Sequence, residues 1–195
     1  MRTAPIVFAL LLFAGCASAP PAPNPALHDE LIAMKDADQA IRKRALADPK
    51  NEALHAEWNA VDAKNLARMK EIIDRYGWPT VAMVGKDGVS AAWTLSQHAD
   101  PPFLHRVLPM MKKSVDAGEL PGGLYATSLD RTLIQDKQKQ VYGSQFDTQN
   151  GHCQPLPMED PDHVDDRRKA IGLGPLSEYA KQLCEMYHLT PTKSD

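Results

Sequence analysis

Along most of the chain after residue 26, apolar residues recur every three or four positions, which is the spacing of an amphipathic helix. Glycine or proline follows several of these segments, and both residues commonly end helices. The pattern predicts helices over residues 27–46, 51–76, 102–116, 162–171 and 175–187, a short helix from Gly122 or Gly123 to Leu129, and a helix that follows a turn at 85–88 and ends near Ala99.

In the second half of the chain the period changes, and polar and apolar residues alternate as they do in strands. Residues 132–135 and 140–146 are therefore predicted to pair as a β-hairpin around a polar turn at 136–139. The predicted fold class is mainly α, a single compact helical domain over residues 27–190 with one small hairpin, followed by a disordered tail at 191–195. A length of about 165 residues suits one domain with one core.

The beginning of the chain has the organisation of an export signal. Arg2 provides a positive charge, residues 6–13 form an apolar stretch too short to span a bilayer, and Phe13-Ala14-Gly15-Cys16 resembles the processing motif of bacterial lipoproteins. We expect a signal peptide over residues 1–15 and lipidation of Cys16. The alternative is an ordinary cleaved signal peptide with an incidental cysteine, since phenylalanine stands where leucine is usual.

Residues 17–25 are rich in proline and alanine, a composition that favours an extended, semi-rigid chain. The lipidated cysteine and this tether, residues 16–26, are therefore predicted to hold the domain off a membrane. Ala17 follows the cysteine, and in Gram-negative lipoproteins a residue other than aspartate there usually permits transfer to the outer membrane. The expected location is the cell envelope, at the periplasmic face of the outer membrane, with the membrane as a partner through the lipid anchor.

The charge of the chain limits the kinds of partner that we expect. The formal net charge is −3, and removal of the signal peptide would take away one arginine and no acid, leaving −4. Short basic runs at 42–44 and 167–169 have acidic residues nearby and are typical of solvated helix faces. Nucleic acid is not an expected partner, because domains that bind it carry a basic patch or stripe. A periplasmic protein or a small molecule stays as the expected partner.

With Cys16 assigned to the lipid, Cys153 and Cys184 form an even pair in an exported chain, which favours a disulfide. Closing a loop of about 30 residues would stabilise the fold by roughly 3 to 4 kcal/mol. The alternative is two free thiols. Metal binding is not expected of these cysteines, because no CxxC or histidine-rich spacing accompanies them.

The stretch 77–100 ends in the densest polar cluster of the chain, the sequence QHAD at 97–100. Trp78 lies between a glycine and a proline and is predicted to be a buried anchor at that corner. A histidine with an adjacent carboxylate and amide is suited to proton transfer or ligand binding. The alternative is that His98 and Asp100 cap the helix end, where the helix dipole favours a cation.

Two polar residues fall on helix faces that are otherwise apolar. Asp38 occurs in the stripe of the first helix, and Gln39 and Arg42 put an amide and a base within one turn of it. Asn65 lies within or beside the stripe of the second helix. A buried asparagine must be hydrogen-bonded, because leaving its amide unpaired is costly.

Several short motifs follow one another along the chain: GWP at 77–79, Asp87-Gly88, Ala92-Trp93, QHAD at 97–100, Asp130-Arg131, QVYGSQ at 140–145, EDP at 159–161, RR at 167–168 and Gly172-Leu173. Together with Asn65, this order resembles an uncharacterised bacterial family of domains of unknown function, over about residues 30–180. Ser144 stands where the family pattern has threonine, and both residues carry a hydroxyl group. The resemblance implies a fold and a set of marked polar residues, and it implies no reaction, cofactor or partner.

The first functional hypothesis is an enzyme or a ligand-binding domain whose site lies where the QHAD helix ends and faces the hairpin. His98 would be the general acid or base, oriented by Asp100 or Asp130, and Arg131 would bind an anionic group of the substrate. The residues that would contact the ligand are Gln97, Asp130, Gln140, Tyr142 and Gln145. A helical core has little use for so many polar groups unless they satisfy one another in a network.

The second hypothesis is a non-enzymatic periplasmic lipoprotein of the immunity or envelope-accessory type, which would bind another protein through an exposed apolar or acidic patch. The sequence contains no HExxH, nucleophile-elbow or nucleotide-binding pattern, so no metal is predicted and the cofactor is left unknown. His98 and Asp100 with one distant ligand form the one candidate metal set. Whether the protein is an enzyme is left open.

Overall fold

The computed structural model describes residues 22–149 and 151–190. The predicted signal peptide, the lipidation site Cys16, the tether up to residue 21 and the predicted tail at 191–195 lie outside the described residues.

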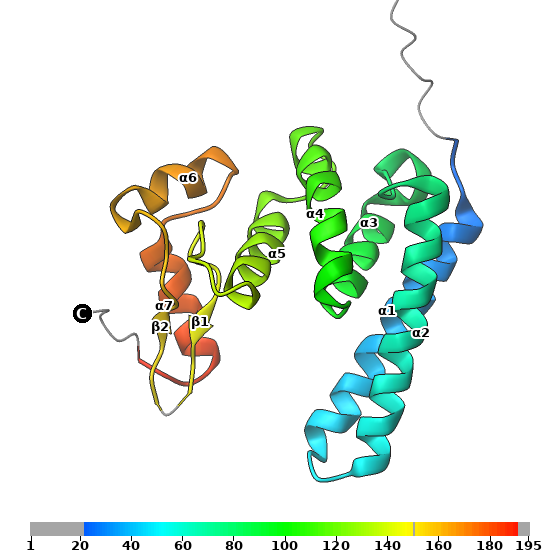
Figure 1. The fold of residues 1–195 in the computed structure, drawn as a ribbon, viewed down its shortest axis with the longest axis horizontal. Coiled ribbons are helices and arrows are strands. Elements are labelled where there is room, and N and C mark those ends of the chain that lie inside the picture. Colours follow the sequence, from blue (N-terminus) through cyan, green and yellow to red (C-terminus); the bar gives the residue numbers. More distant parts are fainter. Residues whose placement is uncertain (1–21, 150, 191–195) are drawn as a thin grey trace, which may run out of the picture.

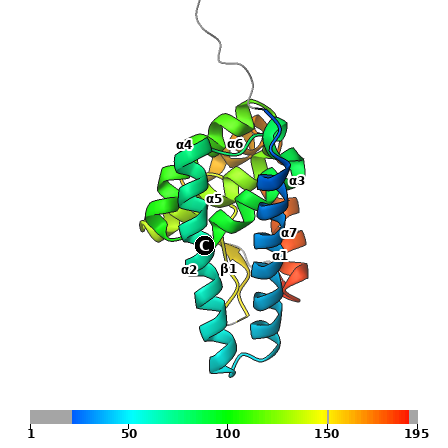
Figure 2. The same cartoon turned by 90° about the vertical axis from the view of Figure 1, so that its right-hand side faces the viewer.

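The chain begins with a hairpin of two long helices, α1 (Pro25–Ala47) and α2 (Glu52–Tyr76) (Figure 1). An asparagine caps the start of each: the side-chain oxygen of Asn24 accepts a hydrogen bond from the backbone N–H of Leu27 at 3.1 Å, and that of Asn51 accepts one from Leu54 at 3.2 Å. Gly77 ends α2 with a positive φ of 71°, a conformation that glycine adopts without strain. The two helices run antiparallel (Figure 2).

Three further helices follow: α3 (Val81–Gln97), α4 (Pro101–Asp116) and α5 (Gly122–Gln135). The predicted turn near residue 85 is present as a break inside α3, where Gly85 has φ 70° and ψ 170°. Asp100 caps α4, accepting a hydrogen bond from the backbone N–H of Phe103 at 2.9 Å. A single residue therefore separates the cap of α4 from His98, which caps the end of α3.

The hairpin prediction is right in kind and wrong in position. Residues 132–135 continue α5, and the two strands are β1 (Phe146–Asp147) and β2 (Gln154–Pro155), which pair antiparallel. The Thr132 hydroxyl donates to the carbonyl of Ser128 at 2.9 Å, so this residue is satisfied within the helix. Residues 140–145 form no hairpin arm, because their amides turn toward α5 instead of a neighbouring strand.

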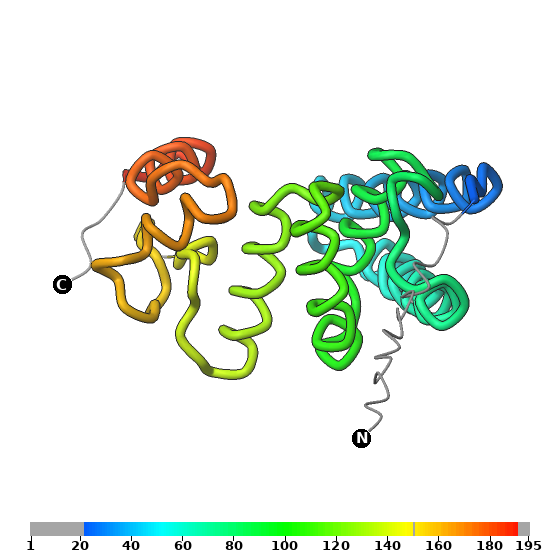
Figure 3. The backbone as a smooth tube through the Cα atoms, turned by 90° about the horizontal axis from the view of Figure 1, so that it is seen from above, coloured from blue at the N-terminus to red at the C-terminus, as the bar shows by residue number. Residues whose placement is uncertain are grey.

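The chain ends with a 3₁₀ turn η1 (Pro161–His163), then α6 (Val164–Ala170) and α7 (Leu176–Met186). A disulfide joins Cys153 to Cys184, whose Cα atoms are 5.8 Å apart, so the predicted pairing is confirmed. Figure 3 shows that the elements follow one another across the molecule nearly in chain order, from α1 and α2 at one end to α6 and α7 at the other.

The hydrophobic core is built from α1 to α4 and the segments that join them. Its largest fully buried side chains include Leu31, Met69, Ile72 and Phe103. Trp78 is only 8% exposed and belongs to this core, so the predicted corner anchor is confirmed. All its fully buried members lie between residues 27 and 120. The fold is thus a single, mainly α domain with one small hairpin, as predicted. Among the described helices, none combines the length and the apolar character needed to cross a membrane.

Candidate functional site

His98 stands at the C-terminal end of α3 and contacts a carboxylate that is distant in the sequence. Its Nδ1 lies 3.0 Å from Oδ1 of Asp38, which comes from the middle of α1. Asp38 is 1% exposed, while the His98 side chain is 22% exposed. The carboxylate that orients His98 is therefore that of Asp38, and neither Asp100 nor Asp130 has this role.

Asp38 is held ionised by its hydrogen bonds. Burial raises the pKa of this carboxyl group, but hydrogen bonds from His98 and Arg42 outweigh burial, and the pKa falls from 3.8 to about 2. Gln39 adds a further hydrogen bond of 2.7 Å from its Nε2. An ionised carboxylate can only accept, so Nδ1 of His98 carries the proton toward Asp38. In the neutral ring, Nε2 then has the free lone pair.

Arg42 links this pair to α2. Its guanidinium donates to Asp38 at 3.2 Å and to Oδ1 of Asp62 at 2.6 Å. Trp58 donates from Nε1 to the other oxygen of Asp62 at 2.9 Å, and its ring lies 4.5 Å from the Arg42 guanidinium carbon. These contacts fix Asp38 from two helices, which restricts the His98 ring that it holds.

Arg131, on α5, brings a second positive charge to the end of α3. Its Nη1 donates to the backbone carbonyl of Gln97 at 3.0 Å. Burial and then the nearby charge of Arg42 lower the pKa of the Arg131 guanidinium. In the part of the chain that the structure describes, Arg131 pairs with no carboxylate. An arginine has five N–H groups, so Arg131 can donate to a further group. The carbonyl that it contacts belongs to Gln97, the residue before His98.

Gln97 also belongs to the cluster at the end of α3. Its Nε2 donates to the hydroxyl of Ser128 at 2.7 Å, and its Oε1 is buried without a donor among the described residues. The site therefore brings together Gln97, His98 and Arg131, which the sequence marked, with Asp38, Arg42 and Asp62, which the site hypothesis did not include.

The charges in this cluster balance when His98 is neutral. Two carboxylates, Asp38 and Asp62, stand beside two guanidinium groups, Arg42 and Arg131. Arg42 is hydrogen-bonded to both carboxylates, and Arg131 is the cation of the cluster that pairs with neither. An anion beside Arg131 would be near a histidine that is able to accept or return a proton.

A metal ion fits this cluster less well than the arginine that is there. Single ligand atoms of Asp38, Asp62 and His98 lie within 4.8 Å of one another. The Arg42 guanidinium bridges the two carboxylates, and Nδ1 of His98 is already hydrogen-bonded to one of them. The carboxylate oxygens that would bind a metal ion therefore already accept hydrogen bonds from Arg42 and His98. Asp100, the other metal ligand considered with His98, is engaged at the start of α4, where Lys70 binds its second oxygen at 3.1 Å.

Asp130 anchors a loop. Its carboxylate is fully buried and accepts the backbone N–H groups of Val141, Tyr142 and Ser144 at 2.8, 3.0 and 2.8 Å. Gln140, also fully buried, donates from Nε2 to the carbonyl of Gln145 at 2.9 Å and accepts from its N–H at 2.9 Å. The Asp130 side chain thereby holds the loop 140–145 against α5, and the Gln140 side chain closes the loop on itself.

Tyr142 and Gln145 lie in this loop network too. The Tyr142 ring packs edge-on against Tyr125 of α5, with centroids 6.4 Å apart. The Gln145 amide donates to the Ser144 hydroxyl at 3.2 Å and to the carbonyl of Thr127 at 3.5 Å. Four of the residues expected to contact ligand, Asp130, Gln140, Tyr142 and Gln145, thus have structural contacts of their own, and none is hydrogen-bonded to His98.

Asp38 and Arg42, which the site hypothesis did not include, are nevertheless indicated by the sequence pattern. Asp38 interrupts an apolar stripe, and a charged residue on a core-facing position is rare unless it is paired. Arg42, one helical turn later, is the natural partner for it. Asp62 shows no such signal, because its partner Arg42 lies 20 residues away in sequence.

The sequence model described as "Family of unknown function (DUF6624)" matches residues 25–191. No curated protein and no solved structure matches the chain.

Proposed function

Because the chain belongs to the family of unknown function DUF6624, we propose its function from its own residues: it is a membrane-anchored envelope lipoprotein whose domain binds a small anionic ligand at the end of α3. In this proposal His98 transfers a proton to or from that ligand. The observation that supports it is the His98–Asp38 pair beside Arg131.

The proposed chemistry follows from the roles that these groups can take. Asp38 holds the Nδ1–H of His98 and stabilises the imidazolium when Nε2 accepts a proton. Arg131 would hold the anionic group of the ligand, and Gln97 would accept a hydrogen bond at its Oε1 from an N–H or O–H of the ligand. The pair resembles the base and orienting acid of nucleophilic sites, but here the protein supplies no adjacent serine or cysteine among the described contacts of His98. Water or the ligand itself would be the proton donor.

A thermal-shift screen of the chain from Ala22 onward tests the ligand site. That part of the protein contains the whole described core and the whole family match. The screen uses small carboxylates, phosphates and hydroxy acids, with His98→Ala and Arg131→Ala in parallel. Exposed His105 and Arg75 provide matched controls as His105→Ala and Arg75→Ala.

We expect at least one anion to raise the melting temperature of the wild type and of both controls, and to leave Arg131→Ala unshifted. His98→Ala should lose turnover of that ligand, or its proton exchange, more than it loses binding. If every anion stabilises the wild type and Arg131→Ala equally, Arg131 is a helix cap and the proposal fails.

The anchor has a separate test. Replacing Cys16 with serine in the full chain should move the protein from the membrane fraction to the soluble periplasmic fraction and abolish incorporation of labelled palmitate. An ordinary signal peptide would leave both unchanged.

A protein-binding lipoprotein is the second candidate, and one observation favours it. Met186 and Tyr187, adjacent at the end of α7, are 75% and 56% exposed. Exposed apolar side chains that adjoin one another suit a protein contact. This candidate predicts that His98→Ala retains all biological activity while Met186→Asp loses it.

A further inference from the structure

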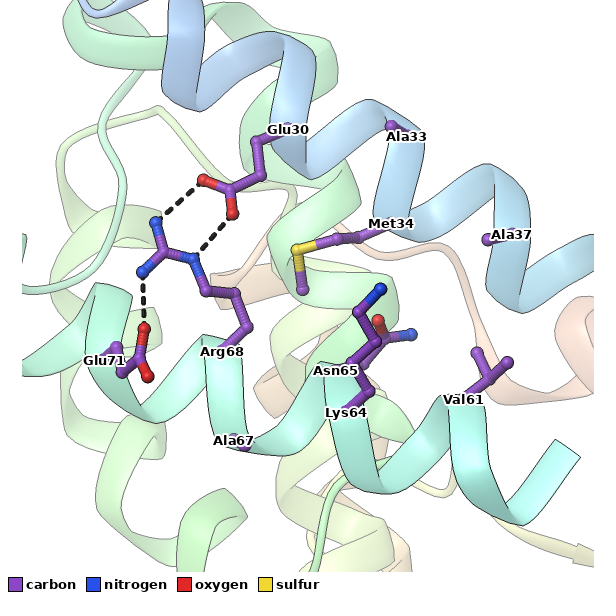
Figure 4. Close-up of a pocket in the computed structure, with 10 residues that line it drawn as sticks. All are labelled: Glu30, Ala33, Met34, Ala37, Val61, Lys64, Asn65, Ala67, Arg68 and Glu71. Carbon is purple, nitrogen blue, oxygen red and sulfur yellow. Dashed lines mark hydrogen bonds and ion pairs between the residues drawn. The ribbon is translucent and has the colours of Figure 1, made fainter. Parts of the chain in front are cut away.

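A cavity of about 550 Å³ opens between α1 and α2, apart from the His98 cluster (Figure 4). Its walls are mostly apolar: Ala33, Met34 and Ala37 of α1 and Val61 and Ala67 of α2. The volume falls in the range of small-molecule sites, which combine apolar walls with a few placed polar groups.

Asn65 is a buried polar residue in the wall of this cavity. It is 7% exposed, and its Nδ2 is buried without an acceptor in the described part of the chain. The sequence predicts that a buried asparagine is hydrogen-bonded, and here the expected acceptor is not supplied by the protein. A buried N–H without an acceptor is unfavourable, so the site is better satisfied by a ligand that brings an oxygen.

The charges around the cavity indicate what kind of oxygen this is. Arg68 is held by two carboxylates: Glu30 accepts two hydrogen bonds from it at 2.6 and 2.9 Å, and Glu71 accepts one at 2.6 Å. Lys64 is exposed and forms no ion pair within residues 22–149 and 151–190. Lys64 is therefore the cation at the cavity without an ionic partner, and with it the charges of Glu30, Glu71 and Arg68 balance.

Figure 4 shows how Lys64 and Asn65 lie. The Lys64 side chain extends in front of the Asn65 amide toward Met34 on α1. An exposed lysine without partners can rotate aside and still reach a group bound behind it. Rotation of Lys64 would uncover the part of the Asn65 amide that it overlies in this view.

We propose that this cavity binds a small monocarboxylic acid with an apolar body. One carboxylate oxygen accepts the hydrogen bond of Asn65 Nδ2 and pairs with Lys64, and the apolar body lies along Met34, Ala37 and Val61. The site is independent of the function proposed for His98, because the two share no residue.

Isothermal titration of the chain from Ala22 onward with sodium octanoate tests this site. 1-Octanol and octylammonium keep the apolar chain and change the head group. Asn65→Leu keeps the side-chain volume and removes the amide, and Asn59→Leu makes the same change at an exposed position of α2. Lys64→Met removes the charge.

We expect octanoate to bind one to one, octanol at least tenfold more weakly, and octylammonium not at all. Asn65→Leu should weaken octanoate at least tenfold and Lys64→Met several-fold, while Asn59→Leu and His98→Ala leave the affinity unchanged. Asn65→Leu should also raise the melting temperature of the ligand-free protein, since the unpaired amide is gone.

The proposal is overturned if octanol binds as tightly as octanoate, or if Asn65→Leu keeps the affinity. Loss of octanoate binding in His98→Ala would overturn it as well, since the anion would then occupy the cluster at the end of α3. If octanoate does not bind at all, the proposal for the cavity is overturned too.

Discussion

At the scale of single residues, Asp38 shows how a polar group on a core face becomes part of a site. It is almost fully buried, and three side chains donate to it: Gln39, Arg42 and His98. Burial alone would make its charge unfavourable, and the charge persists because these donors surround it. The same contacts hold His98 in one orientation.

Acid should remove the contribution of Asp38 to stability. The folded-state pKa of about 2 lies below the ordinary 3.8, so this contribution is complete above pH 4 and is lost as the pH falls toward 2. A shift of this size corresponds to about 2 kcal/mol of unfolding free energy. Guanidinium unfolding of the wild type at pH 5 and at pH 2 measures the loss.

Asp38→Asn serves as the comparison. It should be less stable than the wild type at pH 7 by about 3 kcal/mol, because one side of Arg42 is left without a charge partner. Between pH 4 and 2 its unfolding free energy should fall by less than that of the wild type. Asp74→Asn, at an exposed position, should behave as the wild type. Equal pH profiles for wild type and Asp38→Asn would contradict this account of Asp38.

The sequence located part of this site and missed the rest for a physical reason. Gln97 and His98 were predicted because they occur in the densest polar cluster, and Arg131 because its motif belongs to the series that resembles the family. The partner of His98 lies 60 residues earlier in the chain, and only the packing of α3 on α1 brings it within reach. No local pattern encodes such a distance, although Asp38 in an apolar stripe pointed to an unusual residue.

At the scale of elements, α5 has two polar sides with different roles. Arg131 reaches the end of α3, and Asp130, the residue before it, accepts the amides of the loop 140–145. Neighbouring residues on a helix point in different directions, so one dipeptide serves two neighbours. The motif Asp130-Arg131 therefore combines a residue of the candidate site with a residue that positions a loop.

Asp130→Asn should loosen the loop 140–145 without altering the cluster at His98. The variant keeps one acceptor oxygen and replaces the other by an N–H₂ group that faces backbone donors, at a cost of about 3 kcal/mol. Hydrogen exchange should become faster at the amides of Val141, Tyr142 and Ser144. Asp136→Asn, an exposed change at the end of the same helix, is the control.

A different result would reassign Asp130. If the exchange of the loop amides is unchanged while anion binding at Arg131 is lost, Asp130 acts on the ligand and its loop contacts are secondary.

Gly143 allows the loop 140–145 to turn. Its φ is 70°, and the Leu176 side chain lies only 2.8 Å from where a Cβ would stand.

The helices were predictable to within a few residues at most ends, because capping residues and apolar spacing agree there. Asn51 and Gly77 are examples, since both cap α2 as the sequence indicates. The hairpin was misplaced because residues 140–145 alternate without forming a strand of the sheet. Their amides are satisfied by the buried side chain of Asp130, a contact that alternation cannot reveal.

At the scale of the whole molecule, the two ends of the chain are held together differently. The fully buried members of the hydrophobic cluster fall between residues 27 and 120. Beyond residue 140, Arg168 donates to the carbonyls of Tyr142 and Gly174, and the disulfide joins Cys153 to Cys184. The C-terminal part thus relies on polar contacts and a covalent link where the N-terminal part relies on apolar burial.

Reduction of the disulfide should therefore destabilise the C-terminal part first. The link closes a segment with a sequence separation of 31 residues. A closure of this length contributes about 4 kcal/mol in the chain-entropy description. Exchange mass spectrometry with and without reductant should show faster exchange over residues 146–190 and unchanged protection in α1 to α4.

Cys184→Ser should reproduce the effect without reductant, and Cys153→Ser should match it. A single cooperative loss of protection over the whole chain would show that the two parts unfold as one unit. In that case the disulfide stabilises the molecule as a whole.

The first described contacts of the chain fix the point at which it enters the domain. Asn24 caps α1 and also donates its backbone N–H to the carbonyl of Met83 at 2.9 Å, so the point where the chain enters the domain is pinned to the start of α3. At 1.5 Å per residue, the helix carries Asp38 about 20 Å from that entry point. With the lipid anchor proposed above, a tether attached there would place the entry end nearer the bilayer than the His98 cluster. Ligands of that cluster would then arrive by diffusion through the aqueous periplasm, and lipids of the anchoring leaflet would stay out of reach.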